Sequence, residues 1–544
     1  MAGSSPFLGL RGNALMTAQT LLVVLPAFVL FGYNQSNLGG LVSLSDWTDH
    51  FPQIDTKNYT GAVKSQHATI QGVVIATFTL GAMIGCLSCS YTADKFGRRM
   101  VIFAGALLSL IGMVLECSAF QLAQLVVGRT ILGAGVGMLS GTVPTWQSEC
   151  CDPKHRGRHV VLDGLFISLG YMLQAWINLG FYQFKTGPVT WRPAVAIPIS
   201  FALVLLGSVF FMPESPRWLV RQGRHADAEN TIVALKASED AANDVAVKAE
   251  LAAIDRALEI MSMQKTSLTS LLSMGEDRLL YRFGLCILLQ FYQQMSGGNL
   301  ISVYSTVIFE QGLGLSSQTA RILSGGTLTW KFLSCFVSFF AIDRFGRRAV
   351  LMVSGTGMAS CMLGLAVATS FPKSVFGAQV ASVLFVFLFN FFIPIGFLGA
   401  NFLYCTEIAP LGLRVAMASI STANHWLWNF VVTMITPVAI STIGYQYYIV
   451  FTIIGFCIPV SVYFLYPEVS TRYENLPLIL VSVQELTRIL YQKTMGLRLE
   501  DIDLIFRESP SVMKTVAYAR NRVSCTDEEV LEKDKHEHKE VAQP

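Results

Sequence analysis

Residues that could form ion pairs occur twice in nearly the same order. The stretch "DKFGRRM" covers residues 94–100, and "DRFGRRA" covers residues 343–349, an offset of 249 positions. Each copy places an acid and two arginines around a glycine, Gly97 in the first and Gly346 in the second. Carboxylates and guanidinium groups form charge-assisted pairs, and glycine permits a tight turn. We therefore expect ion-pairing chemistry at two equivalent turns.

Two further motifs repeat at similar offsets and indicate a duplicated unit. Glu149 and Arg156 recur 258 positions later as Glu407 and Arg414, and the Pro-Glu pairs at 213–214 and 467–468 lie 254 positions apart. Three independent motifs thus share nearly one spacing. Such internal repeats are typical of membrane transporters, in which two similar bundles enclose a site near the bilayer midplane.

Long uncharged segments flank the charged motifs along the chain. The chain has 544 residues, of which 52% are hydrophobic and 14% charged, against about 25% charged in a soluble domain. A helix of about 20 residues crosses a bilayer. Twelve segments of about this length are predicted to do so: 18–42, 69–92, 100–119, 122–146, 160–182, 193–213, 283–309, 318–342, 349–370, 376–405, 414–438 and 446–466. The predicted fold is all-α, with twelve transmembrane helices in two pseudo-symmetric six-helix bundles.

These segments divide the chain into six parts. They are a cytoplasmic N-terminus (1–17), an N-terminal bundle (18–213), a charged helical linker (214–282), a C-terminal bundle (283–468), an anomalous insert (469–493) and a largely disordered cytoplasmic tail (494–544). Without the insert, the chain reads "YPETMGLRLEDIDLIF" without interruption. We interpret the insert as a translated intron, and a genuine insertion is the alternative.

Basic residues set the expected orientation. Loops 93–99, 147–159 and 343–348 carry arginine and lysine on the side of the linker and both termini, so this side is predicted to be cytoplasmic. The plasma membrane is the expected location. The opposite loop then carries an outward glycosylation sequon, Asn58-Tyr59-Thr60. None of the eleven cysteines lies in that loop, so no disulfide framework is expected.

The sequence shows no set of residues that is typical of an enzyme active site. The run "GAGVG" at 133–137 imitates a dinucleotide loop, but it lies within segment 122–146, where Gly133, Gly137 and Gly141 favour close helix packing. The eight histidines show no metal-binding spacing, and a net charge of +3 gives no reason to expect nucleic acid. We expect no catalytic residues, no metal and no cofactor.

Several motifs together resemble the sugar porters of the major facilitator superfamily, particularly the fungal members. The matching stretches are "DKFGRR", "GRTILGAGVGM", "HRGR", "PESPRWLVRQGR", "QQMSGGN", "DRFGRR" and "LEDIDLIF". The resemblance covers residues 20–468 and 494–506. It implies alternating access between two domains, with a small sugar or polyol held between them. It also implies a monomer in the lipid bilayer, with H+ as a coupling ion in some members.

The resemblance places substrate contacts in segment 283–309. Gln293, Gln294 and Asn299 stand where the family binds sugar hydroxyls, a task that suits amides because each offers donors and an acceptor. Tyr304 is expected to close the outer side. Elsewhere the chain departs from the family: Gly164 replaces a glutamine, and the aromatic position before Glu407 is Phe402.

Two more departures place charged or titratable groups in the site. Lys331 replaces an asparagine, and the amide of segment 414–438 falls on His425, with Asn424 beside it. An intramembrane cation is a functional candidate. We expect Asp163 to brace Lys331 as an ion pair; the alternative makes Lys331 the counter-ion of a sugar acid or a quinate-like carboxylate.

Energy coupling depends on Asn34. Proton-coupled members carry aspartate at this position, facing the arginine that matches Arg129. An amide exchanges no proton near neutral pH, so Asn34 slightly favours uniport. Asp163 and His425 are the candidates for a compensating symport. Three alternatives stay open: proton symport of a sugar, a proton-coupled carrier of an acid, and a nutrient sensor that does not transport.

The repeated charges are interpreted as a cytoplasmic clasp. We expect weak ion pairs that join the two halves and open in each cycle; the alternative role is to set membrane orientation. The members of the cytoplasmic clasp are Asp94, Arg98, Arg99, Glu149, Arg156, Glu214, Asp343, Arg347, Arg348, Glu407, Arg414 and Glu468.

Overall fold

A computed structural model gives the arrangement of the chain. It describes residues 7, 9–56, 58–151, 156–184, 187–236, 247–249, 251–252, 254–256, 258, 268–275, 277–410, 413–467, 506–507 and 515–516. The insert at 469–493 lies outside these residues, as do Glu468 and most of the predicted tail.

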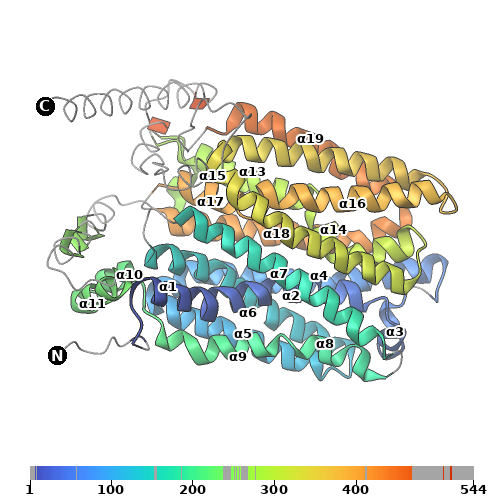
Figure 1. The fold of residues 1–544 in the computed structure, drawn as a ribbon, viewed down its shortest axis with the longest axis horizontal. Helices are drawn as coiled ribbons and strands as arrows, with labels where there is room; N and C mark the ends of the chain where they lie inside the picture. The colour runs from blue at the N-terminus through green and yellow to red at the C-terminus, as the bar shows by residue number, and fades with distance from the viewer. Residues whose placement is uncertain are drawn as a thin grey trace, which may run out of the picture.

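The first half of the chain forms one group of parallel and antiparallel helices, the lower group in Figure 1. Its helices are α1 (Gly12–Gln19), α2 (Leu25–Leu41), α3 (Ser45–His50), α4 (Gly61–Phe96), α5 (Arg98–Cys117), α6 (Leu122–Cys150), α7 (Arg156–Tyr182), α8 (Arg192–Ala196) and α9 (Ile199–Ser208). The π-helical segment Thr20–Val24 joins α1 to α2, so these three form one long first span.

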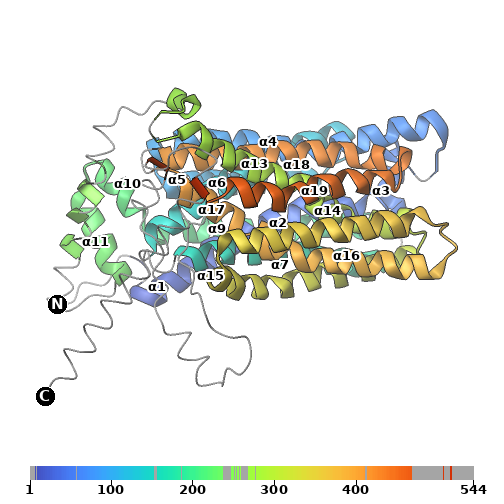
Figure 2. The same ribbon diagram turned by 90° about the horizontal axis from the view of Figure 1, so that it is seen from above.

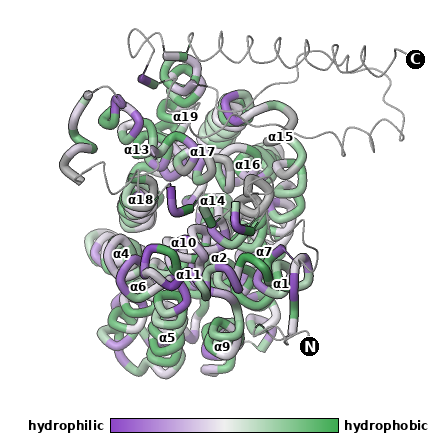
Figure 3. Tube along the Cα trace, turned by 90° about the vertical axis from the view of Figure 1, so that its left-hand side faces the viewer, coloured by the Kyte–Doolittle hydropathy of each residue, from purple (hydrophilic) through white to green (hydrophobic). Residues whose placement is uncertain are grey.

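The second half forms the upper group in Figure 1. Its helices are α13 (Leu279–Met295), α14 (Gly298–Val307), α15 (Ser317–Ser370), α16 (Phe376–Phe397), α17 (Ala400–Ile408), α18 (Arg414–Thr442) and α19 (Gln446–Leu465). Figure 3, seen along the helices, separates the two groups side by side. The contact between them runs mainly through α18 on α4, α15 on α7 and α14 on α2.

The two ends of this bundle differ. Helices α10 (Pro216–Arg221) and α11 (His225–Lys236) lie beyond one end, which we name the α10 end, as Figure 2 shows. Helix α3 lies at the other end, which we name the α3 end (Figure 1).

The twelve-helix prediction is confirmed, although one long helix covers two spans. Helix α15 changes direction at Gly346, whose φ of 76° is left-handed, and Gly97 has a φ of 91° between α4 and α5. Only glycine adopts such angles readily, so the two copies of the repeated motif make equivalent turns.

Nine of the described helical segments are long and apolar enough to cross a membrane. The other three spans are α13 with α14, the first part of α15, and α18. Helices α13 and α14 are each too short to count alone, because the chain breaks at Gly297. The first part of α15 and α18 carry polar side chains such as Lys331 and His425 in their interiors.

Candidate functional site

Side-chain amides meet at the centre of the second half, close to its contact with the first half. Gln293, on α13, donates from Nε2 to the carbonyl oxygen of Phe397 at 2.8 Å. Its Oε1 accepts a hydrogen bond from Asn401 Nδ2 at 2.7 Å and lies 2.7 Å from His425 Nδ1. Helices α13, α17 and α18 thus contribute one buried polar cluster.

Asn299 connects this cluster to the other half. Its Nδ2 donates to Thr433 Oγ1 at 2.9 Å and to Asn429 Oδ1, both on α18. Its Oδ1 accepts a hydrogen bond from Gln35 Nε2, on α2 of the first half, at 2.8 Å. We name the set Gln35, Gln293, Gln294, Asn299, Asn401, His425 and Asn429 the amide site.

The amide site contains buried polar atoms with unused hydrogen-bonding capacity. Among the described residues, Gln294 Oε1, Asn401 Oδ1 and Asn429 Nδ2 have no hydrogen-bond partner. Each such buried group carries a desolvation penalty of about 1–3 kcal/mol. One hydroxyl can donate to one of the two oxygens and accept from Asn429 Nδ2, so a ligand with several hydroxyls could satisfy all three atoms.

Near the α3 end, one buried contact lies within the second half and another crosses between the halves. The Tyr304 hydroxyl donates to the carbonyl oxygen of Thr433 at 2.9 Å and is 1% exposed. Arg321, on α15, donates from Nη1 to the carbonyl oxygen of Gly40 in the other half at 2.9 Å and from Nη2 to Ser43 Oγ. The two halves are therefore joined at this level.

Two predicted substrate contacts lie at the margin of the amide site. The half-buried Phe402 ring packs on His425, with centroids 5.5 Å apart. Asn424 instead donates from Nδ2 to the carbonyl oxygen of Ile287 at 3.0 Å. The structure thus brings Phe402 to the cluster but turns Asn424 toward the backbone of α13.

Gly164 stands where the family carries a glutamine, and the structure gives a steric reason. A Cβ on Gly164 would lie 2.4 Å from the carbonyl oxygen of Leu398, which no side chain tolerates without movement. The first half approaches the second so closely here that a glutamine has no room.

The expected ion pair between Asp163 and Lys331 does not form. Lys331 Nζ donates to Ser302 Oγ at 2.7 Å and lies 4.4 Å from the ring centroid of Tyr171. Asp163 Oδ1 is buried with no hydrogen-bond partner among the described residues. Tyr171 lies eight positions beyond Asp163 on α7, about 12 Å along the helix, so the two charges sit at different depths.

A buried charge pair lies between α5 and α6, next to the backbone of Asn34. Arg129 Nη1 donates to the carbonyl oxygen of Asn34 at 3.1 Å, and Nη2 donates to that of Ile75 at 3.2 Å. The Asn34 side chain itself donates to the carbonyl oxygen of Leu30. The acid near Arg129 is Glu116, with Oε1 4.0 Å from Nη1.

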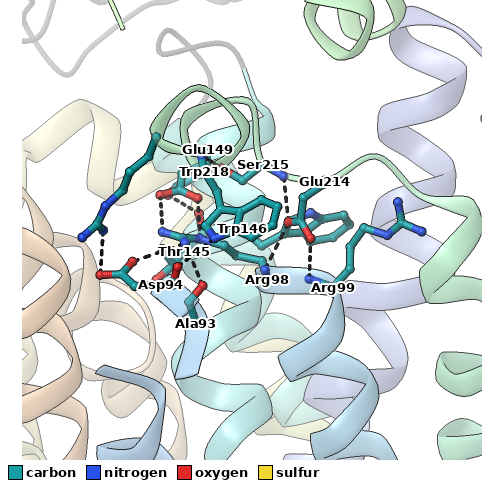
Figure 4. A network of polar contacts seen from close by, with 12 residues as sticks. Ala93, Asp94, Arg98, Arg99, Thr145, Trp146, Glu149, Glu214, Ser215 and Trp218 are labelled. Atoms are coloured by element: carbon teal, nitrogen blue, oxygen red, sulfur yellow. Dashed lines mark hydrogen bonds and ion pairs between the residues drawn. The ribbon is translucent and has the colours of Figure 1, made fainter. Parts of the chain in front are cut away.

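The clasp residues of the first half form a network at the α10 end (Figure 4). Arg98 is 4% exposed; its Nε donates to Glu149 Oε2 at 3.0 Å and its Nη2 to Glu149 Oε1 at 3.2 Å. Its Nη1 lies 3.3 Å from Asp94 Oδ1, and Asp94 also pairs with Arg221 at 2.7 Å. The Arg98 guanidinium thus binds Glu149 in a bidentate manner and makes one further contact with Asp94.

Glu214 joins this network through the backbone. Its carboxylate oxygens accept hydrogen bonds from the amides of Arg98 and Arg99, each at 3.1 Å. The guanidinium of Arg99 donates to the carbonyl oxygen of Phe210. The segment after α9 is thereby fixed to the start of α5.

The second half repeats the arrangement in outline. Arg347 pairs with Glu407 at 3.1 Å, and Arg348 donates from Nε to the carbonyl oxygen of Val462 at 3.4 Å. Each of these described ion pairs lies within one half, and the expectation that the clasp residues join the halves stays a prediction. The structure does not describe the side chains of the other members: Arg156, Asp343, Arg414 and Glu468.

The predicted glycosylation site lies beyond the α3 end of the first half. Asn58 is exposed, and its Nδ2 donates to Asp55 Oδ2 at 2.7 Å, in the loop before α4.

Several residues of the site were not predicted from the sequence. Gln35, Asn401 and Asn429 are amides inside predicted spans. An amide side chain within a membrane span is itself a reason to consider the residue as part of a site. Glu116 and Arg321 are buried charges inside segments otherwise counted as apolar. A search for every charge within a span finds both.

Comparison with known proteins agrees with this architecture. A family model described as "Sugar (and other) transporter" matches residues 20–475. The sugar transporter STL1 of Saccharomyces cerevisiae is 32% identical over 483 residues, covering 88% of this chain and 83% of that protein. The high-affinity fructose transporter ght6 of Schizosaccharomyces pombe is 27% identical, covering 93% of this chain and 90% of that protein.

Solved structures share the fold. The proton:xylose symporter XylE bound to 6-bromo-6-deoxy-D-glucose superposes with a TM-score of 0.70 at 21% identity, covering 84% of this chain and 97% of that one. A partially occluded, inward-open XylE from E. coli gives a TM-score of 0.68 at 19% identity, covering 84% and 100%. At these identities the likeness shows the fold alone. The family match and the relatives together show that the chain belongs to the sugar porters of the major facilitator superfamily.

Proposed function

We propose that the chain carries a small sugar or polyol across a membrane by alternating access between its two six-helix halves. The amide site binds the hydroxyls, and Tyr304 and Arg321 close the path toward the α3 end. The relatives are described as sugar, fructose and glucose transporters, which supports this class of substrate.

One observation carries the proposal: the buried amide site contains amide atoms without hydrogen-bond partners. Gln294 Oε1, Asn401 Oδ1 and Asn429 Nδ2 lack protein partners among the described residues. A buried polar group is normally hydrogen-bonded. A polyhydroxylated ligand offers the missing partners in a geometry that an apolar ligand does not.

The test is uptake by the purified protein in proteoliposomes, with a panel of labelled sugars, polyols and sugar acids. Gln293→Ala removes the acceptor shared by Asn401 and His425, and loss of such a partner costs about 1–3 kcal/mol. We expect apparent substrate affinity to fall by about tenfold to a hundredfold. Asn424→Ala is the matched control, because its amide donates away from the site.

Counterflow of labelled against unlabelled substrate detects a carrier with or without an ion gradient. If no member of the panel shows counterflow, the proposal fails. Equal affinity in Gln293→Ala and wild type would remove the amide site from substrate binding.

The location follows from the same proposal. We expect the α10 end, with both termini, to face the cytoplasm of a plasma-membrane protein, and Asn58 to carry glycan outside. The clasp residues would then stabilise each half near the cytoplasmic surface as it moves. Loss of a gel-mobility shift in Asn58→Gln checks the glycan.

A second candidate is an acidic substrate. Lys331 is 2% exposed and donates to Ser302 Oγ, and it forms no ion pair with Asp163, the acid expected beside it. A buried cation that is left without a carboxylate is costly, and the carboxylate of a sugar acid could pair with it. Lys331→Met should abolish uptake of sugar acids and spare neutral sugars; loss of neutral sugar uptake instead would leave Lys331 a structural role only.

A further proposal concerns the insert at residues 469–493. We expect the form lacking residues 469–493 to transport, because its removal restores the continuous family motif. Loss of counterflow in the deleted form would favour a genuine insertion, and sequencing of the transcript decides the origin.

A further inference from the structure

We propose that Glu116 is the proton-binding carboxylate of this carrier and that its pair with Arg129 couples sugar movement to a proton. The inference rests on the proposed transport function. It places the acid on α5, in a chain whose Asn34 on α2 cannot exchange a proton.

The surroundings of Glu116 are those of a buried acid with one charged partner. Its side chain is 1% exposed, as is that of Arg129. Glu116 Oε1 lies 4.0 Å from Arg129 Nη1 and has no hydrogen-bond partner among the described residues. A buried carboxylate whose charged partner lies 4.0 Å away is stabilised less than one that accepts direct hydrogen bonds. Such a carboxylate accepts a proton more readily.

The absence of a side chain at Gly128, on α6, leaves room for the Glu116 side chain. Gly128 precedes Arg129 on α6, and a Cβ there would lie 3.0 Å from Glu116 Cγ. Glu116 therefore occupies the space that a larger residue at 128 would fill. One turn of α6 therefore both leaves space for Glu116 of α5, at Gly128, and carries its partner Arg129.

The other titratable groups around Glu116 leave Arg129 as its main partner. Neighbouring helices contribute Arg192 of α8, which donates to the carbonyl oxygens of Cys117 and Ala119, and His50 of α3, whose Nε2 lies 3.2 Å from the Ala119 carbonyl oxygen. On α5 itself the neighbour is Cys117. On α2, the Tyr33 hydroxyl donates to the carbonyl oxygen of Ala194. Helices α4 and α9 present no charged side chain here: Ile75 contributes a carbonyl oxygen, and α9 carries no titratable residue.

Arg129 links the acid to the amide site. Its guanidinium donates to the carbonyl oxygen of Asn34. The next residue, Gln35, donates to Asn299 across the interface between the halves.

A proton on Glu116 changes the charge balance of this chain of contacts. While Glu116 is ionised, it competes with the carbonyl oxygens of Asn34 and Ile75 for the guanidinium. Once the carboxylate has accepted a proton, Arg129 is left with the two carbonyls, which belong to α2 and α4. Protonation thus alters how tightly α2 is held beside Gln35 and Asn299, where the halves meet the substrate.

The experiment uses the full-length protein in proteoliposomes with an internal pH dye. Addition of transported sugar should bring protons in, and a gradient of one pH unit should support about tenfold accumulation at one proton per sugar. Glu116→Gln should abolish both effects while counterflow continues, and Glu116→Asp should restore proton movement in part. Cys117→Ser, one position away, is the control for local disturbance.

Each result is decisive. Counterflow without proton movement in the wild type overturns the inference but keeps the transport function, whereas absence of counterflow removes the transport function itself. Proton movement that persists in Glu116→Gln also overturns the inference, and loss in Asp163→Asn alone assigns the proton to α7 instead. If Glu116→Gln fails to fold, the wild-type dye measurement and Glu116→Asp still decide.

Discussion

The Glu214 carboxylate caps the first turn of α5. Both of its oxygens accept hydrogen bonds from backbone amides at 3.1 Å, those of Arg98 and Arg99. The N-terminus of a helix carries partial positive charge, so an anion is favourable there. Burial nevertheless raises the pKa of Glu214 above its ordinary value, and the backbone hydrogen bonds that it accepts from Ser215, Arg99 and Arg98 only reduce that shift.

The pKa of Glu214 predicts how stability changes with pH. Because the folded-state pKa is above the unfolded one, protonation favours the folded protein as the pH falls through that window. The thermal midpoint of the wild type should therefore rise relative to Glu214→Gln as the pH is lowered from neutrality toward about 4.3, the ordinary glutamate pKa. Thermal denaturation in detergent across this range measures the difference. A difference that is constant with pH, or that moves the other way, contradicts the assignment.

Residue contacts could be predicted from the sequence where a motif fixed the spacing. The repeated stretch led to Arg98 and Glu149, which pair in the structure. The partner predicted for Lys331 was wrong, because its Nζ donates to Ser302 and not to Asp163. Depth follows from 1.5 Å per residue, whereas the partner depends on how α7 is rotated and shifted against α15, which no residue count reveals.

At the scale of elements, α4 and α6 approach so closely that only glycine fits between them. A Cβ on Gly133 would lie 2.0 Å from the carbonyl oxygen of Phe78, and one on Gly137 would lie 2.0 Å from that of Ala82. The predicted packing role of this glycine run is thus seen directly. Small residues at four-residue spacing permit such backbone contact between membrane helices.

Gly137→Ala should separate α4 from α6 and destabilise the first half. Overpacking of a filled interior costs about 1–3 kcal/mol, and the clash is with backbone, which has little freedom to move. The yield of folded protein and its thermal midpoint in detergent should both fall. Gly207→Ala on α9 is the matched control, since nothing lies within 4 Å of its added Cβ.

The control should be neutral or slightly more stable, because alanine favours a helix over glycine by about 1 kcal/mol. A Gly137→Ala protein as stable as the wild type would mean that α4 and α6 can move apart without cost.

The breaks within spans were harder to predict than the spans themselves. Segment 283–309 was expected as one helix, but the chain divides it into α13 and α14 at Gly297, whose φ is 89°. The break lies between Gln294 and Asn299, so it turns amides from two helix ends toward one site. Hydropathy identifies an apolar segment, but a local break depends on the conformation of one glycine.

At the scale of the whole molecule, the two halves are closed at the α3 end and joined through polar contacts. Gln35 reaches Asn299, and Arg321 reaches the carbonyl oxygen of Gly40. A small polar cavity lies beside these contacts, lined by Ser36, Gly40, Gln174, Ser302, Ser305 and Ser324. Sequence repeats predicted the two halves, but which end is closed depends on contacts between residues about 280 positions apart, such as Arg321 and Gly40.

Arg321 should hold this closed state, because its guanidinium bonds across the interface. Hydrogen bonds to a charged group contribute about 1.5–3 kcal/mol, and 1.4 kcal/mol changes an equilibrium constant about tenfold. Arg321→Gln should therefore raise the population that is open at the α3 end by about tenfold or more. A cysteine placed at Ser305, in the polar cavity, should then react faster with a polar thiol reagent, measured as the difference from the same protein without that cysteine. Arg224→Gln, an exposed arginine at the α10 end paired with Asp227, should leave the rate unchanged. Equal rates in all three backgrounds would show that the cavity opens without breaking the Arg321 contact, and the closure would then have to depend on Tyr304 and Gln35 alone.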